Sequence, residues 1–314
     1  MPGAGTLTAV GAERRTVSSW LRVAAPAERL AMVRILVAAY ALVWLAGALG
    51  GLLGLTGADA ARWEPIGVLA PLGSPPAAAL VHVLLVLTFL TGLAFAAGAK
   101  ARITGPLFAA CFLVVATYRS SWGQIFHTDD LVTIHLIILA VVPSAAAWAW
   151  DARRPAEVPA PHERFGWPLR LMSVITVATY VLAGVAKLRT SGLDWVTGTV
   201  LRDQIAHDNL LKELFGAPSS PVAAPLLHHA WLFPPMAAFA VLVELGAPVA
   251  LLGGRWRNAW VGSAWVFHLG ILVMMTTFFP YPLSGAAFAS MFAVERLPRY
   301  VARTWRRRRR QADE

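Results

Sequence analysis

Long uninterrupted apolar runs alternate with short polar segments along most of the chain. Runs of this length, without the polar stripe of a surface helix, are typical of helices that cross a bilayer. The pattern predicts an all-α integral membrane protein, a polytopic helical bundle of about eight spans. The expected spans are about 30–55, 78–97, 103–118, 131–150, 168–187, 236–252, 258–279 and 283–297, the last either a span or a re-entrant piece.

The polar segments supply the expected division of the chain. Residues 1–29 are basic and are predicted to form a cytoplasmic tail. Residues 30–297 are predicted to form the transmembrane domain, with a long outer loop at 188–235. Residues 298–314 are rich in arginine and are predicted to form a second cytoplasmic tail.

The charge of the chain agrees with this division. Hydrophobic residues make up 57% of the chain and charged residues 14%, whereas soluble domains are about a quarter charged. With eight spans, 20 of the 27 basic residues lie on the side of the two termini. Basic residues gather on the cytoplasmic side, so both termini are predicted to be cytoplasmic and the protein a multi-pass cell-membrane protein. The same placement explains the net charge of +10 through contact with anionic membrane lipid, and no nucleic acid is expected as a partner.

Two further observations concern single residues. Cys111 is the one cysteine of the chain, so no cysteine metal site is expected, and no other metal-binding motif is seen. Arg34 lies one turn inside the first span, where a long cationic side chain is predicted to reach back to the inner membrane surface.

The stretch from Tyr180 to Gly198 reads Y-V-L-A-G-V-A-K-L-R-T-S-G-L-D-W-V-T-G. On a helix, Tyr180, Gly184 and Lys187 share one face. The small residues Ala183 and Gly184 would leave room for a flat molecule beside the Lys187 ammonium. The alternative is a lysine that marks the end of a span by reaching to the membrane surface.

Other polar residues are predicted to gather at the same outer edge. Asp130 follows His127 by one helical turn, and a carboxylate so placed can orient an imidazole. Asp129 is predicted to cap the first turn of this helix. His135 lies about 80° around the helix from His127, so the two are not expected to share a metal.

Glu244 and His268 lie deeper, about 12 Å and about 16 Å below the outer surface at the usual helical rise. A carboxylate at that depth must be paired or must line a wet cavity. Glu244 is therefore predicted to face the bundle interior, either in a structural hydrogen bond or in a functional site. The outer loop that carries Trp195 can cover the same edge.

The stretch at Lys187 resembles the membrane domain of the vitamin K-dependent gamma-glutamyl carboxylase and the horizontally transferred transmembrane (HTTM) family. The resemblance implies that Lys187 is the base that deprotonates reduced vitamin K. The stretches S-S-W-G-Q-I-F-H, V-E-L-G-A-P-V and F-H-L-G-I-L-V-M-M are similar to family elements and place His127, Glu244 and His268. The implied site has Lys187 and His127 as catalytic residues and His268, Glu244, Tyr180, Trp195 and Asp130 as quinone-binding residues.

The function implied is that of a quinol-dependent oxygenase or carboxylase-like lyase. Its cofactor would be reduced vitamin K or menaquinone, at a site facing the extracytoplasmic side. The chain departs from the carboxylase at Ala186, Ile125 and Phe126, and it has no counterpart of the large lumenal domain. Quinone chemistry is therefore expected to be shared more than carboxylation of a protein.

Two alternatives remain open, and with them whether the protein is an enzyme. One is a peptide or toxin maturation or export factor resembling the sporulation-delaying-protein B type, with a peptide substrate or soluble partner protein. The other is a non-catalytic membrane component that binds a lipid.

Overall fold

A computed structural model describes residues 17–152, 159–298 and 300, with only the backbone described at Val17, His127, Thr128 and Ala152. The basic tails predicted at 1–29 and 298–314 lie largely outside these residues. The described part is helical and contains no β-strand. Its α-helices are α1 (Val17–Leu21), α2 (Ala27–Gly54), α3 (Ala78–Ala97), α4 (Ala101–Ser120), α5 (His127–Val141), α6 (Glu163–Ser191), α7 (Thr199–Leu214), α8 (Ala223–Leu227), α9 (Phe233–Leu245), α10 (Gly254–Met275) and α11 (Pro280–Leu283).

Five helices in the described part are long and apolar enough to cross a membrane, by length and composition: α2, α3, α4, α6 and α10. The prediction of an all-α, multi-pass membrane protein is thus confirmed in its general form. The count of eight spans and the side on which the termini lie are not confirmed. Two of the other expected spans form shorter helices, α5 of 15 residues and α9 of 13 residues.

Proline accounts for several differences between the predicted and observed helix ends. The helix predicted at 131–150 ends at Val141, because Pro143 cannot continue it. The span predicted at 236–252 divides into α9 and the 3-10 helix η7 (Ala247–Leu252), with Pro248 at the start of η7. Helix α6 begins at Glu163, so Pro168 lies inside it and not in the first turn as predicted.

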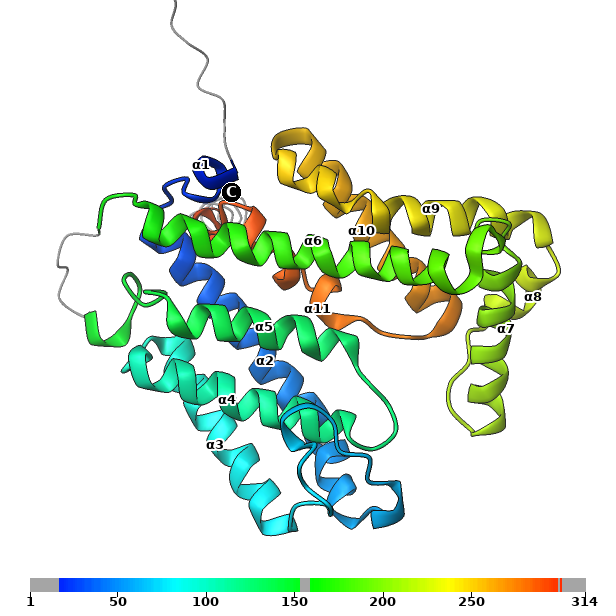
Figure 1. The fold of residues 1–314 in the computed structure, drawn as a ribbon, viewed down its shortest axis with the longest axis horizontal. Coiled ribbons are helices and arrows are strands. Elements are labelled where there is room, and N and C mark those ends of the chain that lie inside the picture. The colour runs from blue at the N-terminus through cyan, green and yellow to red at the C-terminus, as the bar shows by residue number, and fades with distance from the viewer. Residues whose placement is uncertain (1–16, 153–158, 299, 301–314) are drawn as a thin grey trace, which may run out of the picture.

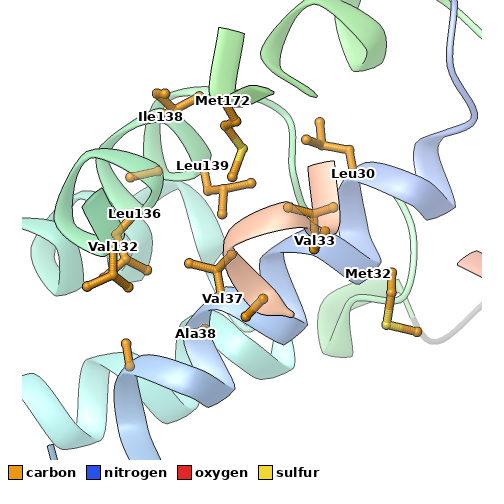
Figure 2. Packing of buried hydrophobic residues seen from close by; sticks show 14 of the residues in the cluster. Leu30, Met32, Val33, Val37, Ala38, Val132, Leu136, Ile138, Leu139 and Met172 are labelled. Carbon is orange, nitrogen blue, oxygen red and sulfur yellow. The ribbon is translucent and has the colours of Figure 1, made fainter. Parts of the chain in front are cut away.

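Two groups of helices lie on either side of α6 (Figure 1). In this view helices α2 to α5 lie below α6, α9 lies above it, and α10 crosses behind it. Buried apolar residues of α2 and α5, among them Val37 and Leu136, pack together with Met172 of α6 (Figure 2). On the other side, Val177 of α6 belongs to a second buried cluster with Val243 of α9 and Ala264 of α10, so α6 joins the two groups.

The last apolar stretch is not a continuous helix, and this corrects the alternative in which it forms an eighth helical span. It contains α11, then the 3-10 helices η8 (Ala286–Met291) and η9 (Val294–Arg296). The segment runs antiparallel to α10, because the Trp265 indole donates to the carbonyl of Leu283 at 2.8 Å and Arg257 donates to that of Met291 at 2.8 Å. Irregular backbone at membrane depth is tolerated where protein surrounds it.

Burial of the broken segment meets that condition. Tyr281 is fully buried, and Phe288 is 2% exposed. At its end, Glu295 accepts two hydrogen bonds from Arg29 of α2, at 2.8 and 3.0 Å. The segment thus returns the chain to the end of the bundle where α2 begins. We call this end the arginine end, after Arg29, Arg170 and Arg257, and the opposite end of α6, with Lys187 and Trp195, the lysine end.

Arg34 does not reach the membrane surface as predicted. Its side chain is fully buried and donates to the carbonyls of Ser144 at 2.9 Å, Trp148 at 2.8 Å and Ala96 at 3.4 Å. These carbonyls belong to the last turn of α3 and to the segment after α5. Gly98, with φ of 74°, leaves the space, because a Cβ there would lie 2.8 Å from Ala149 and 3.1 Å from a nitrogen of the guanidinium. One cation therefore links three chain segments.

We predict that Arg34→Met lowers the free energy of unfolding by about 3 kcal/mol, because it removes several charge-assisted hydrogen bonds from buried carbonyls. Thermal unfolding in detergent measures the change. Arg102→Met, at an exposed arginine near the same turn, is the matched control and should change the midpoint little. Equal effects of the two substitutions would contradict the role of Arg34.

A second prediction concerns Glu295, which lies outside the long apolar helices. Burial raises its pKa, but the hydrogen bonds and charge of Arg29 outweigh burial and hold the pKa below the ordinary value of 4.5. A lowered pKa stabilises the folded state above the unfolded pKa, and this stabilisation is lost as pH falls through the folded pKa.

Glu295→Gln should therefore lower the unfolding midpoint at neutral pH. The difference from the unsubstituted protein should shrink as the pH falls below about 4.5. A difference that stayed constant between neutral pH and about pH 3 would show that the charge of Glu295 is not the cause.

Candidate functional site

An ion pair between Lys187 of α6 and Glu244 of α9 lies at the lysine end. The Lys187 ammonium donates to Oε1 of Glu244. The Glu244 side chain is 3% exposed and the Lys187 side chain 22% exposed. Glu244 thus faces the bundle interior, paired as a carboxylate at that depth must be.

Gly184 allows α6 and α9 to approach closely enough for this pair. A Cβ at Gly184 would lie 2.8 Å from the end of the Leu245 side chain and 3.0 Å from Cβ of Glu244. The space predicted beside Lys187 for a flat molecule is therefore occupied by α9 on the Gly184 side. The small residue serves helix packing instead, as small residues do in membrane bundles.

Trp195 covers the pair from the start of the outer loop. It ends the 3-10 helix η5 (Gly192–Trp195), which follows α6 directly, and it is 4% exposed. The Lys187 nitrogen lies 5.4 Å from the centre of a Trp195 ring, within the range of a cation–π interaction. Gly198, with φ of 83°, then passes so close to Phe233 that any side chain there would collide with its backbone.

Tyr180 and His268 form the neighbouring part of the site. The Tyr180 hydroxyl lies 2.8 Å from Nε2 of His268, so α6 and α10 are joined about two turns of α6 from Lys187. Aromatic rings of Trp260 and Phe279 flank them, with centres 5.0 Å from Tyr180 and 5.2 Å from His268. His268 lies within electrostatic range of Lys187, as Tyr180 does of Glu244.

Three buried polar atoms of this group have no hydrogen-bond partner in the described part of the chain. They are Oε2 of Glu244, Nδ1 of His268 and the indole nitrogen of Trp195. Unpaired buried polar atoms are costly, so several in one place indicate a site that a ligand can satisfy. A hydroxyl that donates to a carboxylate or imidazole, on a flat ring that packs among aromatic side chains, matches these groups.

Five of the seven predicted site residues thus meet at the lysine end: Lys187, Glu244, Trp195, Tyr180 and His268. The other two, His127 and Asp130, lie on the first turn of α5. The side chain of His127 is outside the described part of the structure. Asp130 is exposed. The structure leaves the roles of these two residues as predictions.

Asp129 is paired with another helix, which differs from its predicted role as a cap of α5. It is 2% exposed, and Arg119 of α4 donates to it at 2.6 Å. The Arg119 guanidinium also lies 3.4 Å from the ring centre of Phe126. A cap was predicted because acidic residues favour the first turn of a helix. The pairing with Arg119 was missed because the sequence does not show that α4 lies beside this turn.

Sequence reasoning also missed a buried polar chain in the middle of the bundle. Nδ1 of His135 lies 2.6 Å from the Tyr281 hydroxyl, and Nε2 lies 3.3 Å from the hydroxyl of Thr176. Thr176 in turn donates to the carbonyl of Ala287 in η8 at 3.2 Å. A histidine inside an apolar run was the available signal, but its partner belongs to the broken segment, whose path the sequence does not reveal.

These observations define a multi-pass helical membrane protein with a buried lysine–carboxylate pair between two of its helices. Residues 24–293 match the family model of the HTTM domain. The chain therefore belongs to the HTTM family, which is associated with the membrane domain of vitamin K-dependent carboxylase. No curated protein and no solved structure matches the chain significantly.

We predict that Lys187 and Glu244 are energetically coupled. Lys187→Met or Glu244→Leu alone should lower the free energy of unfolding by about 3 kcal/mol, because each leaves a buried charge without its partner. The double variant should be more stable than the sum of the two losses predicts. Thermal unfolding of all four proteins in detergent gives the coupling energy. Additive losses would show that the two side chains do not act as a pair.

Proposed function

We propose that the protein binds a quinol at the lysine end and that the Lys187–Glu244 pair accepts a proton from a quinol hydroxyl. The observation that carries this proposal is the group of unpaired buried atoms beside the pair, above all Oε2 of Glu244. Tyr180, His268 and Trp195 would hold the ring, and the substrate would be reduced vitamin K or menaquinone. Membership of the HTTM family supports the same chemistry.

The pair accepts one proton in either of two ways. With its shared proton on Lys187, the acceptor is the free Oε2 of Glu244. With that proton on Glu244, the acceptor is the neutral Lys187 amine, which is the base predicted from the sequence. In both cases an ammonium beside the new phenolate stabilises it.

Access to the pair requires movement of the outer loop. Trp195 and Glu244 are both almost fully buried, so a ring cannot reach Oε2 past them. Trp195 belongs to a short 3-10 turn flanked by Gly192, with φ of 58°, and Gly198. Movement of this turn would open the site toward the extracytoplasmic side that the sequence predicts for it.

The proposed reaction is oxidation of the quinol by dioxygen to the quinone epoxide. One oxygen atom enters the ring as the epoxide, and the other leaves as water with the two quinol hydrogens. The quinol supplies all four electrons that dioxygen takes up, two in its oxidation to the quinone and two in epoxidation of the ring. Coupling to carboxylation would require a carbon acid that gives up a proton in the same cycle. Chemistry of this kind would make the protein a quinol-dependent oxygenase or carboxylase-like lyase.

A turnover measurement tests the proposal. The purified protein in mild detergent should convert reduced menaquinone or reduced vitamin K and oxygen to the epoxide, detected by mass spectrometry. Lys187→Ala should lower the rate at least about a hundredfold, the usual contribution of a positioned acid or base. Arg189→Ala, at an exposed arginine two residues on, should leave the rate unchanged. Epoxide formation that did not depend on Lys187 would sink the proposed role of the pair.

A second candidate function is handling of a peptide beside a soluble partner. Large apolar side chains exposed on the outer loop favour it, among them Leu193 at 79%, Phe215 at 82% and Trp231 at 72%. If a short precursor peptide is found to bind the protein, substitution of Phe215 and Trp231 by serine should abolish that binding, with no effect on quinone binding. Unchanged peptide binding by that variant would argue against this candidate.

A further inference from the structure

A polar cavity of about 280 Å³ lies at the arginine end, away from the lysine–carboxylate pair. Arginines from three different helices line it: Arg29 of α2, Arg170 of α6 and Arg257 of α10. All three side chains are half-buried. They lie close enough to influence one another electrostatically.

Among the described residues, the positive charge of the arginines around this cavity exceeds the negative charge paired with them. Arg29 forms an ion pair with Glu295, and in the described part of the chain this is the one ion pair that any of the three arginines forms. Arg257 donates to the carbonyl of Met291 and to the side chain of Asn258, both uncharged groups. The guanidinium of Arg170 lies 4.7 Å from a ring of Trp20, again an uncharged partner. Like charges repel one another, and an anion bound between the guanidinium groups would offset this repulsion.

The remaining walls favour an anion as well. Ser173 and Ser290 also line the cavity, but their hydroxyls bond within the protein: Ser173 donates to the carbonyl of Leu169 at 2.8 Å and lies 3.0 Å from the hydroxyl of Ser290. Gly253 and Gly254 line it where α10 begins, with φ of 77° and 52°. The start of a long helix presents free amide groups and a positive dipole, which strengthen the attraction that the arginines already create.

The size of a ligand that this cavity can hold is limited by its volume and by the close packing of its walls. The volume is that of a small head group and not of a whole lipid, because pockets for drug-sized molecules begin at about 300 Å³. One wall is closed tightly, since a Cβ at Gly166 would lie 1.7 Å from the carbonyl oxygen of Val23. Planar guanidinium groups recognise phosphate through two parallel hydrogen bonds.

We propose that this cavity binds the phosphate group of an anionic ligand, with Arg170 and Arg257 as its principal contacts. Arg29 contributes charge while it remains bonded to Glu295. The ligand carries a phosphate mono- or diester, either as a lipid head group at the membrane surface or as a small phosphorylated molecule. The site is separate from the proposed quinol site and does not depend on it.

Ligand-induced stabilisation tests this proposal with the full chain in a neutral detergent. The unfolding midpoint is measured against inorganic phosphate, a short-chain phosphatidic acid and a short-chain phosphatidylcholine. Arg170→Gln should weaken the apparent affinity for the stabilising ligand about tenfold, the worth of a charge-assisted hydrogen bond. Arg170→Lys, which keeps the charge but loses the fork, should weaken it less.

The control is Arg255→Gln. Arg255 lies two residues before Arg257 on the same helix, is exposed, and stacks on Trp256 and not in the cavity. Stabilisation by inorganic phosphate would identify a soluble ligand as the source, and stabilisation by phosphatidic acid alone would identify a lipid head group. No stabilisation by inorganic phosphate or by phosphatidic acid would overturn the proposal, and so would equal stabilisation by phosphatidylcholine, which carries no net charge. The same conclusion follows if Arg255→Gln weakens binding as much as the Arg170 variants do.

Discussion

A charge that the bilayer cannot solvate must find its partner within the protein, and this constraint governs how the helices of this chain meet. Arg34 satisfies it with three backbone carbonyls that would otherwise lack donors where α3 and α5 end. Lys187 and Glu244 satisfy it with each other across α6 and α9. In both places a glycine removes the side chain that would keep the partners apart, Gly98 for Arg34 and Gly184 for the pair.

The backbone obeys the same rule in the last apolar segment. Its short helices leave carbonyl and amide groups that a continuous helix would pair internally. Side chains from other helices serve some of them: Trp265 and Arg257 of α10 and Thr176 of α6 donate to its carbonyls. The segment also supplies Tyr281 to His135 in return. The broken segment therefore bonds to α5, α6 and α10, and links helices of both groups.

Much of this fold could be predicted from the pattern of apolar runs, because membrane length and hydropathy are local properties. The helix Ala78–Ala97 appears with the predicted ends. That Glu244 and His268 face the bundle interior near each other was also foreseeable, since both are polar residues in apolar runs at similar predicted depths, whereas Lys187 was predicted nearer the outer surface. The partners of Arg34 and Asp129 were not foreseeable, because Ser144 and Arg119 become neighbours only through tertiary packing. The course of residues 280–296 could not be predicted for the same reason. Their composition is that of a span, and side chains of other helices bond to the backbone where the helix is broken.

The pairing of Lys187 changes what proton transfer would cost at this site. A lone neutral lysine that takes a proton from a quinol creates two charges from none, and both must be stabilised in a medium of low polarity. The pair begins with one ammonium and one carboxylate already held together. Transfer of the quinol proton to Oε2 neutralises that carboxylate and leaves the phenolate as the new partner of the ammonium. One ion pair exists before the transfer and one after it, so the step exchanges an anion and adds no charge separation. The Glu244 carboxylate that pairs with Lys187 is therefore the group that would let the lysine stabilise the phenolate without a new separation of charge.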